Sequence, residues 1–395
     1  MPAILEWPGP VVATSTKGDL VDDTIGWRSR LGEVHVFDPS ASTRYQASGW
    51  SPLASATTWR DAGRSAWDLA MSGKAAVGGG MSLADFWFNS AAKSLAPYLF
   101  AAAKTGRSIA DVARWIDAEE RDEVLVMLRG LHPDAALAHQ ATFRREDRAR
   151  SSLFQVMQQI LGVYLDPAVA RSAERSDINA TELLDGTPST LYLTSPYLDQ
   201  ARFRPLFATV VRQVITAVYE HVAATGRPLD PPLLMVLDEA ANIAPVDDLA
   251  TVASTAAAMG LQLVTVFQDL SQIKVRYGDA AGTVINNHRA TLFLPGIKCL
   301  DTLDLASRLI GDHEIDRDSI TTGADGRRSS TTAAHWRRLL PGELARTMRD
   351  RDGVLVYGNL PPIRLRLRPW FDSHRLRRRA SLQPDTLPAT RPSEP

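Results

Sequence analysis

The sequence predicts an α/β fold, in which helices cover both faces of a mainly parallel sheet and an all-α subdomain interrupts that sheet. Two observations predict this fold class. Short apolar runs alternate with helical stretches near both ends of the chain, as they do in parallel sheets that are covered on both faces. Between them, residues 91–169 have a helical pattern throughout, in which Ala, Leu, Arg and Glu dominate.

The N-terminal residues predict a first strand and a ligand-binding loop. After a short helix end and a Pro-Gly-Pro break, a β-branched strand is expected at 11–15, and a second strand at 34–37. The polar loop 16–19 follows the first strand, at the position where α/β folds place ligand-binding residues. Lys17 and Asp19 are therefore candidate ligand-binding residues. The alternative is that both are solvated surface residues.

The chain is expected to have four parts. Residues 1–105 and 186–372 form the two halves of the sheet domain, and residues 106–185 form the all-α subdomain between them. Residues 373–395 are rich in Arg and then in Pro, and are expected to be a disordered tail.

The most informative stretch is the apolar run 233–237, which ends abruptly in Asp238 and Glu239. Such a run predicts a buried central strand, and ligands of parallel sheets bind at the carboxyl ends of the strands. At that position Asp238 could hold Mg²⁺ through a water molecule, and Glu239 could polarise the water that attacks a γ-phosphate. The alternative is a strand that simply ends in a solvated turn.

A second strand end is expected beside this one. A helix at 246–259, stopped by Gly260, leads into the apolar run 261–267, which predicts another buried strand and ends at Gln268. A right-handed crossover would place Gln268 next to the two carboxylates, where an amide side chain can report nucleotide state. The alternative is an ordinary polar residue at a strand end.

The C-terminal part predicts a strand at 290–294, a mobile surface loop at 316–332, and a strand pair at 353–357 and 363–367. In the last strand, alternate positions are basic, so one face is expected to be basic and the other buried. These residues are Arg364, Arg366 and Arg368. They are candidates for contact with a nucleic-acid phosphate backbone, or charges that protect an edge strand from aggregation.

Composition excludes several classes of protein. Among the 395 residues the formal net charge is −1, so any nucleic-acid surface must be local. The single cysteine, Cys299, excludes an internal disulfide framework. No window of 18 consecutive apolar residues and no signal-peptide pattern occurs, so the sequence predicts neither a membrane span nor secretion.

The ordered succession of motifs resembles the TraG/TraD-type coupling proteins of conjugative type IV secretion. The segments that carry the resemblance are 9–20, 237–240, 260–264, 268–273, 276–278, 294–296, 307–311 and 356–360, together with Asn287. They extend over most of residues 1–371, and their order makes the resemblance fairly specific.

The resemblance implies a RecA-like P-loop NTPase fold and a DNA-translocating ATPase, hexameric in the full-length family, that brings DNA and its relaxase to the secretion channel. It implies ATP and Mg²⁺ as cofactors, with Asp238 as the Mg²⁺-associated acid, Glu239 as the catalytic base and Gln268 as the sensor. Lys17 and Asp19 match a family loop near the nucleotide. The all-α subdomain would be the one implicated in recognising the DNA-processing complex.

The chain also departs from that family. The motif G-x-x-x-x-G-K-[ST], whose backbone and lysine hold the β- and γ-phosphates, is nowhere in it. On this ground we expect an N-terminally truncated chain, cytoplasmic as given, that lacks the family's membrane-anchoring helices. An arginine of many relatives aligns with Ala257, and Arg276 and Arg289 are candidate replacements. The competing class is a non-catalytic truncated homologue that acts as a substrate-binding or assembly protein.

Overall fold

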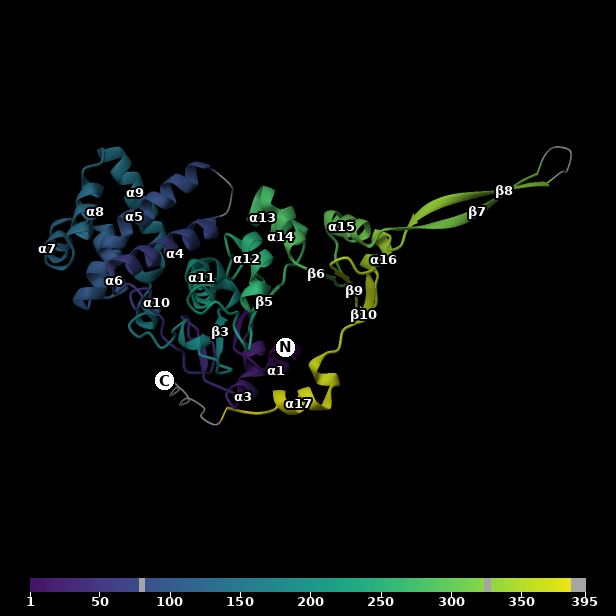
Figure 1. Ribbon diagram of the computed structural model, residues 1–395, viewed down its shortest axis with the longest axis horizontal. Coiled ribbons are helices and arrows are strands. Elements are labelled where there is room, and N and C mark those ends of the chain that lie inside the picture. The colour runs from purple at the N-terminus through teal and green to yellow at the C-terminus, as the bar shows by residue number, and fades with distance from the viewer. Residues whose placement is uncertain (78–81, 323–327, 385–395) are drawn as a thin grey trace.

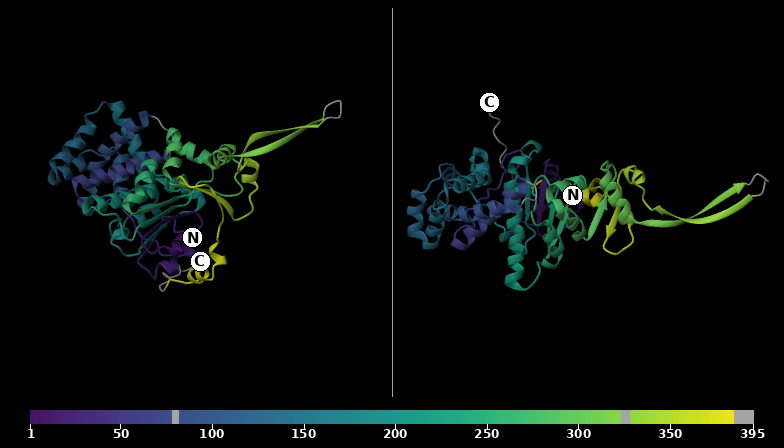
Figure 2. Two further views of the ribbon diagram at one scale, coloured as in Figure 1. Left: turned by 45° about the vertical axis from the view of Figure 1, so that its right-hand side comes forward. Right: turned by 90° about the horizontal axis from the view of Figure 1, so that it is seen from above.

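A computed structural model describes residues 1–77, 82–322 and 328–384, which form an elongated molecule with three parts (Figure 1). A block of helices lies at one end, a five-stranded sheet lies in the middle, and a smaller sheet with a long hairpin lies at the other end. Two further views show the same arrangement (Figure 2).

The central sheet has the strand order β2-β3-β1-β4-β5, and all its paired strands are parallel. All residues of β1 and β3 are buried, as continuous apolar or β-branched runs predict for strands covered on both faces. The α/β fold class is therefore confirmed. The strands are β1 (Val11–Ser15), β2 (Val34–Phe37), β3 (Thr190–Thr194), β4 (Leu233–Leu237) and β5 (Leu261–Thr265).

Alternate residues of the strands point to two different layers of helices. On one face, Phe37 packs edge to face on Phe207 of α11 (Gln200–Thr225), with ring centroids 5.7 Å apart. On the other face, Tyr192 and Leu234 belong to a cluster that includes Ile4. The helices of that second layer are α1 (Pro2–Glu6), α2 (Asp19–Asp22) and α3 (Ile25–Arg28).

The helical block packs against α11 and shares one continuous core with the first face of the sheet. Its two long helices, α4 (Trp59–Val77) and α5 (Ser82–Thr105), contact each other extensively, and α5 also contacts most of the shorter ones. The shorter helices are α6 (Ile109–Asp117), α7 (Asp122–Leu131), α8 (Pro133–Phe143), α9 (Asp147–Leu161) and α10 (Pro167–Ser172).

Further helices connect the strands that follow β4. These are α12 (Leu249–Thr255), α13 (Leu270–Tyr277) and α14 (Ala281–Asn287). Short 3₁₀ helices lie at Gly162–Leu165, Glu182–Leu184, Tyr197–Asp199, Ala256–Met259, Gly278–Ala280 and Trp370–Asp372.

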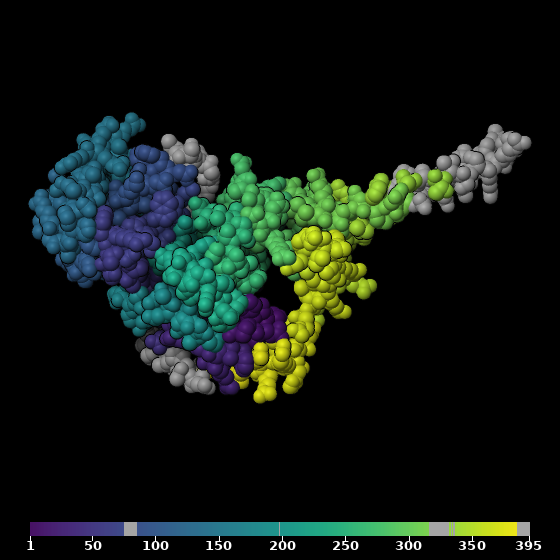
Figure 3. Space-filling model, in the orientation of Figure 1, coloured from purple at the N-terminus to yellow at the C-terminus, as the bar shows by residue number. Residues whose placement is uncertain are grey.

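The prediction that the strand before Gln268 is buried is wrong. β5 is the edge of the central sheet, and Val264 and Val266 are 37% and 43% exposed. The apolar sequence is that of a covered strand, yet no described segment pairs with its outer edge. The space-filling view shows an opening between this part of the molecule and the C-terminal sheet (Figure 3).

The C-terminal sheet is antiparallel, with the order β10-β9-β6. Helices α15 (Leu300–Ile310) and α16 (Gly342–Arg346) pack together beside it. The prediction of a loop at 316–332 is wrong, because most of this segment belongs to a two-stranded hairpin that projects from the molecule (Figure 1). The hairpin segments are mostly polar, so they lack the apolar residues by which a strand is recognised in a sequence. The strands are β6 (Ala290–Phe293), β7 (Asp312–Thr322), β8 (Arg328–Arg338), β9 (Asp352–Tyr357) and β10 (Ile363–Arg366).

The tail also differs from the prediction of disorder from residue 373. Residues His374–Ala380 form α17, in which Leu376 is fully buried against Leu5 of α1. The Arg379 guanidinium lies 4.2 Å from the ring centroid of Trp27. A basic segment is thus ordered by one apolar anchor and by stacking, while residues 385–395 lie outside the described residues.

Candidate functional site

Asp238 lies directly after β4, at the carboxyl end of the sheet, and is partly buried. The Thr14 hydroxyl, at the end of neighbouring β1, donates a hydrogen bond of 2.9 Å to the Asp238 carbonyl oxygen. Burial raises the pKa of the Asp238 carboxyl, and the negative charges of Glu239 and Asp19 raise it further, against the backbone N–H of Glu239, which lowers it. A cation beside this carboxyl would lower its pKa again, as the N-terminal ammonium does in part.

Glu239 begins a tight loop and has a left-handed backbone conformation, with φ of +48°. Its carbonyl oxygen accepts hydrogen bonds from the N–H groups of Asn242 and Ile243, at 2.8 and 3.1 Å. The Asn242 side-chain amide donates to Glu239 Oε2 at 3.1 Å. The carboxylate is thus oriented by its own loop, and its other oxygen makes no such bond to Asn242.

Two arginines from different helices also contact this loop. Arg204 Nε, on α11, donates to the Asn242 carbonyl oxygen at 2.8 Å, and Arg276 Nη2, on α13, donates to the Ala241 carbonyl oxygen at 3.0 Å. Burial lowers the pKa of both guanidinium groups, and the charge of Arg204 lowers that of Arg276 further. Sequence reasoning missed Arg204 and Asn242. The spacing of Asn242 three residues after Glu239 was the one available signal.

The two loop candidates after β1 have different positions. Asp19 starts α2, its Oδ1 accepts from the Leu20 N–H at 2.8 Å, and its charge reaches Asp238. Lys17 is exposed, and its backbone N–H lies 3.5 Å from Ser15 Oγ. The structure therefore brings Asp19 towards the acidic strand end and shows no such approach for the Lys17 side chain among the described residues.

Gln268 is exposed and follows β5, the strand next to β4. The Ala240 N–H donates to the Val266 carbonyl oxygen at 3.1 Å, so the segment that ends at Gln268 runs alongside the Glu239 loop. The Gln268 N–H donates to Gln272 Oε1 at 3.0 Å, which ties it to the first turn of α13. The two strand ends are therefore adjacent, as the crossover rule predicted.

The residues present fit one half of a magnesium–nucleotide site. No group of three His, Cys, Asp or Glu side chains that could hold a metal ion occurs in the described parts of the chain. Mg²⁺ in nucleotide sites needs only one or two carboxylates, because water and phosphate oxygens complete its shell. Asp238 fits that requirement. The phosphate half is different, since the sequence contains no loop of the type G-x-x-x-x-G-K-[ST].

The candidate arginine replacements are engaged within the chain. Arg276 contacts the loop described above, and the Arg289 guanidinium lies 5.1 Å from the ring centroid of Tyr357. The predicted nucleic-acid arginines lie on or next to β10. Arg364 forms an ion pair of 2.6 Å with Asp352, Arg368 one of 3.4 Å with Glu6, and Arg366 is exposed. The apolar face predicted for this strand is not buried, because Ile363 is 49% exposed.

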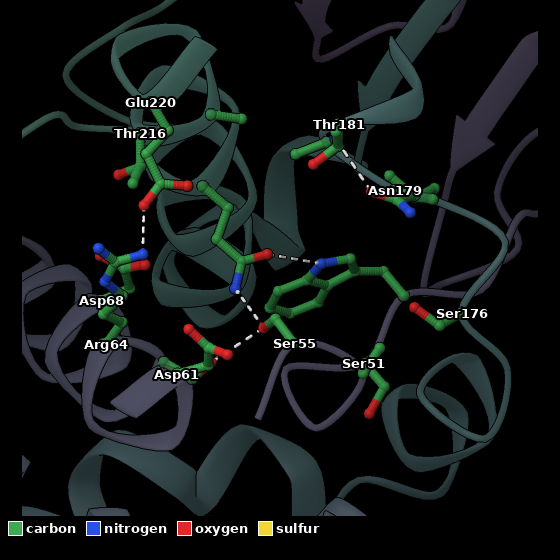
Figure 4. A pocket seen from close by; sticks show the side chains of 17 residues that line it. Ser51, Ser55, Asp61, Arg64, Asp68, Ser176, Asn179, Thr181, Thr216 and Glu220 are labelled. Atoms are coloured by element: carbon green, nitrogen blue, oxygen red, sulfur yellow. Dashed lines mark hydrogen bonds and ion pairs between the residues drawn. The ribbon is translucent and has the colours of Figure 1, made fainter. Parts of the chain in front are cut away.

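A separate polar pocket of about 410 Å³ lies between α4, α11 and the segments 50–55 and 176–181 (Figure 4). In it the Trp50 indole N–H donates to Gln213 Oε1 at 3.1 Å, and Asp68 forms an ion pair with Arg212 at 3.2 Å. None of the predicted site residues lines this pocket. It therefore belongs to the junction of the helical block with α11.

The order of the parallel sheet and the two helix layers define an α/β protein with a RecA-like fold. Solved structures agree with this fold. The unbound conjugative coupling protein TrwBdeltaN70 has a TM-score of 0.67 at 20% identity, over 93% of this chain and 86% of that one. TrwB in complex with ADP and Mg²⁺ has a TM-score of 0.65 at 20% identity, over 93% and 87%.

A family model described as "Type IV secretory system Conjugative DNA transfer" matches residues 1–390, and the chain belongs to this family. A conjugal transfer protein TraG of Escherichia coli is 25% identical over 385 residues, which is 89% of this chain and 57% of that protein. TraG of Rhizobium radiobacter is 30% identical over 172 residues, which is 42% of this chain and 26% of that protein. The chain thus spans little more than half the length of its TraG relatives from E. coli. No helix in its described parts is long and apolar enough to cross a membrane.

Proposed function

We propose that this chain is a module of a conjugative coupling protein and supplies the metal and water side of an ATP site. The observation that carries this proposal is the adjacency of Asp238, Glu239 and Gln268 at two neighbouring strand ends in a chain of this family. Structures of TrwB with ADP and Mg²⁺ and with a non-hydrolysable ATP analogue support the choice of nucleotide and metal.

Each residue has a distinct role in this proposal. Bound Mg²⁺ would neutralise charge on the phosphates, and Asp238 would hold it through a water molecule. Glu239 would accept a proton from the attacking water at the carboxylate oxygen that Asn242 does not contact. Gln268 would orient that water and pass the state of the site to α13, and Asp19 would add negative charge beside Asp238. Lys17 would approach the nucleotide only if its side chain turns inward.

Asp238, Glu239 and Gln268 cannot provide the phosphate-binding part of the site, and DNA transfer requires further partners. DNA, a relaxase and the secretion channel are the proposed partners, and a homohexameric ring is the proposed assembly. The all-α subdomain predicted at residues 106–185 is the proposed contact for the DNA-processing complex. At the level of the whole coupling protein, this module would drive DNA transfer by hydrolysing ATP.

Calorimetric titration of this chain with Mg²⁺ and ATP tests the half-site proposal. We expect no micromolar binding, because no element replaces the phosphate-binding loop. Asp238→Asn is the matched variant, and it should titrate like the natural sequence. Micromolar binding that Asp238→Asn abolishes would show a complete site and contradict the proposal.

A second candidate function is a non-catalytic binding or assembly protein, favoured by the same missing phosphate loop. The two functions differ in what a homologous coupling protein gains from the chain. In a mixture with a full-length homologue, a motor module should raise ATP hydrolysis, and Glu239→Gln should remove that gain. An assembly protein should bind the homologue equally well with either residue and leave hydrolysis unchanged.

We propose that Arg364, Arg366 and Arg368 contact the phosphate backbone of DNA. Arg366 should contribute most, since Arg364 and Arg368 are paired with Asp352 and Glu6. Fluorescence anisotropy with labelled DNA over a range of salt concentrations tests this. Arg366→Ala should lower the salt slope by about one counterion. An unchanged slope in the triple alanine variant would exclude this surface.

A further inference from the structure

The loop after β4 is held from two sides by side chains that are far away in the sequence. Arg204 lies near the start of α11 and Arg276 near the end of α13, and they donate to the consecutive carbonyl oxygens of Asn242 and Ala241. Both guanidinium groups are partly buried. Two charged donors on adjacent carbonyls restrict the loop more strongly than turn hydrogen bonds alone.

The loop needs such restraint because Glu239 has φ of +48°, a conformation that side-chain-bearing residues adopt at an energetic cost. Asn242 is the link between Arg204 and the carboxylate. Its carbonyl oxygen accepts from Arg204 at 2.8 Å, and its side-chain amide donates to Glu239 Oε2 at 3.1 Å. Holding the Asn242 backbone therefore also sets the direction of the Glu239 carboxylate.

The second arginine connects the loop to the other strand end. Asp269 caps α13 by accepting from the Gln272 N–H at 3.0 Å, and Gln272 Oε1 accepts from the Gln268 N–H at 3.0 Å. Arg276 leaves the far end of the same short helix to reach the Ala241 carbonyl oxygen. A displacement of Gln268 would move α13 as a unit and pull on the loop.

We propose that Arg204 and Arg276 form a clamp of positioning residues that fixes Glu239 and couples its position to that of Gln268. The clamp is a property of the fold, whereas the use of Glu239 and Gln268 on a nucleotide rests on the proposed function. The described contact of Arg276 with the loop lies within its own chain.

Hydrogen exchange of the backbone amides, followed by mass spectrometry, tests the clamp without nucleotide. In Arg276→Met and in Arg204→Met, segment 239–243 should exchange about tenfold faster, because each variant removes a charged hydrogen bond. The control is Arg212→Met on α11, which loses contacts of 3.2 Å with Asp68 and 3.3 Å with Asp248 but none with residues 239–243, and should leave this segment unchanged. Unchanged exchange in both clamp variants would overturn the proposal.

Coupling is tested by the helix that carries Gln268. Arg276→Met should also speed exchange in residues 270–277, while Arg204→Met should not, because only Arg276 belongs to α13. Arg276→Lys keeps a donor and should retain part of the protection against exchange. It can replace the methionine variant in this test if that variant does not fold. Equal exchange rates in α13 for both methionine variants would contradict the proposed coupling between Glu239 and Gln268. Micromolar ATP binding that Asp238→Asn abolishes would contradict the proposed function alone and would not change the interpretation of these exchange measurements.

Discussion

The central sheet and the C-terminal sheet differ in how their strands are covered. Strands β1 and β3 are buried along their whole length, with helices on both sides. In the C-terminal sheet, Leu292 of β6 and Ile363 of β10 are 42% and 49% exposed. The difference indicates where stability resides, because the side chains of β1 and β3 are fully covered, whereas Leu292 and Ile363 still contact water.

The arginines beside the two sheets also differ in how deeply they are buried. Arg28 is completely buried under the central sheet and donates to the carbonyl oxygens of Trp7, Gly9 and Pro188 and to Thr190 Oγ1, each within 2.8 Å. Burial lowers its pKa to about 10, which still leaves it charged at neutral pH. Arg364 of β10 instead forms an ion pair with Asp352 in which the arginine side chain is exposed, and surface pairs of this kind contribute little in water. Four predictions test this comparison.

The largest effect is expected in the core under the central sheet. Phe207→Ala should lower the free energy of unfolding by about 3–5 kcal/mol, because it opens a cavity beside Phe37. Leu292→Ala in the C-terminal sheet is the matched control and should cost less than about 1 kcal/mol. Urea denaturation measures both. Equal losses would mean that the two sheets are not covered differently.

Arg28→Leu should be the next most destabilising change. It keeps an apolar stem but leaves buried carbonyl oxygens without a donor, so we expect a loss of about 3 kcal/mol in denaturant unfolding. Arg28→Lys retains a charge and fewer donors, and should be intermediate. A neutral result for the leucine variant would show that water replaces the lost donors.

A pH effect of intermediate size is expected from Asp68 in the helical block. Burial raises the pKa of Asp68 to about 6, although Arg212 lowers it in part. The folded protein thus holds this proton more tightly than the unfolded chain, so this group stabilises the fold below about pH 4 and loses that effect as pH rises to about 6. Asp68→Asn should remove a fall in unfolding free energy of about 2 kcal/mol over this interval. Thermal unfolding from pH 4 to pH 7 measures it, and an identical pH dependence in the variant would contradict the assignment.

The smallest effect belongs to the C-terminal sheet. The Arg364 guanidinium lowers the pKa of the Asp352 carboxyl. Arg364→Ala should raise that pKa towards its ordinary value without a measurable change in melting temperature. NMR titration of Asp352 detects the first effect. A clear loss of melting temperature would show that this ion pair matters for folding and would weaken the contrast between the sheets.

The sequence predicted the buried strands well, because a run of apolar residues can be recognised from neighbouring positions alone. β1 and β2 begin and end as expected, and the acidic end of β4 lies at the carboxyl edge of the sheet. The exposed β5, the β7–β8 hairpin and α17 were mispredicted. Each of these depends on how strands pair or on how a helix packs against the rest of the molecule. Amino-acid composition does not predict such contacts.

The sequence by itself determined the α/β class, the family and the placement of Asp238, Glu239 and Gln268 after apolar strands, because hydrophobic periodicity and motif order are local properties. Only the tertiary structure decided how Glu239 is held. Arg204 and Arg276 contact Asn242 and Ala241 across 38 and 35 residues of the chain, and burial lowers the pKa of both guanidinium groups. Contacts of this kind form when separate elements pack against each other, and no local pattern encodes them.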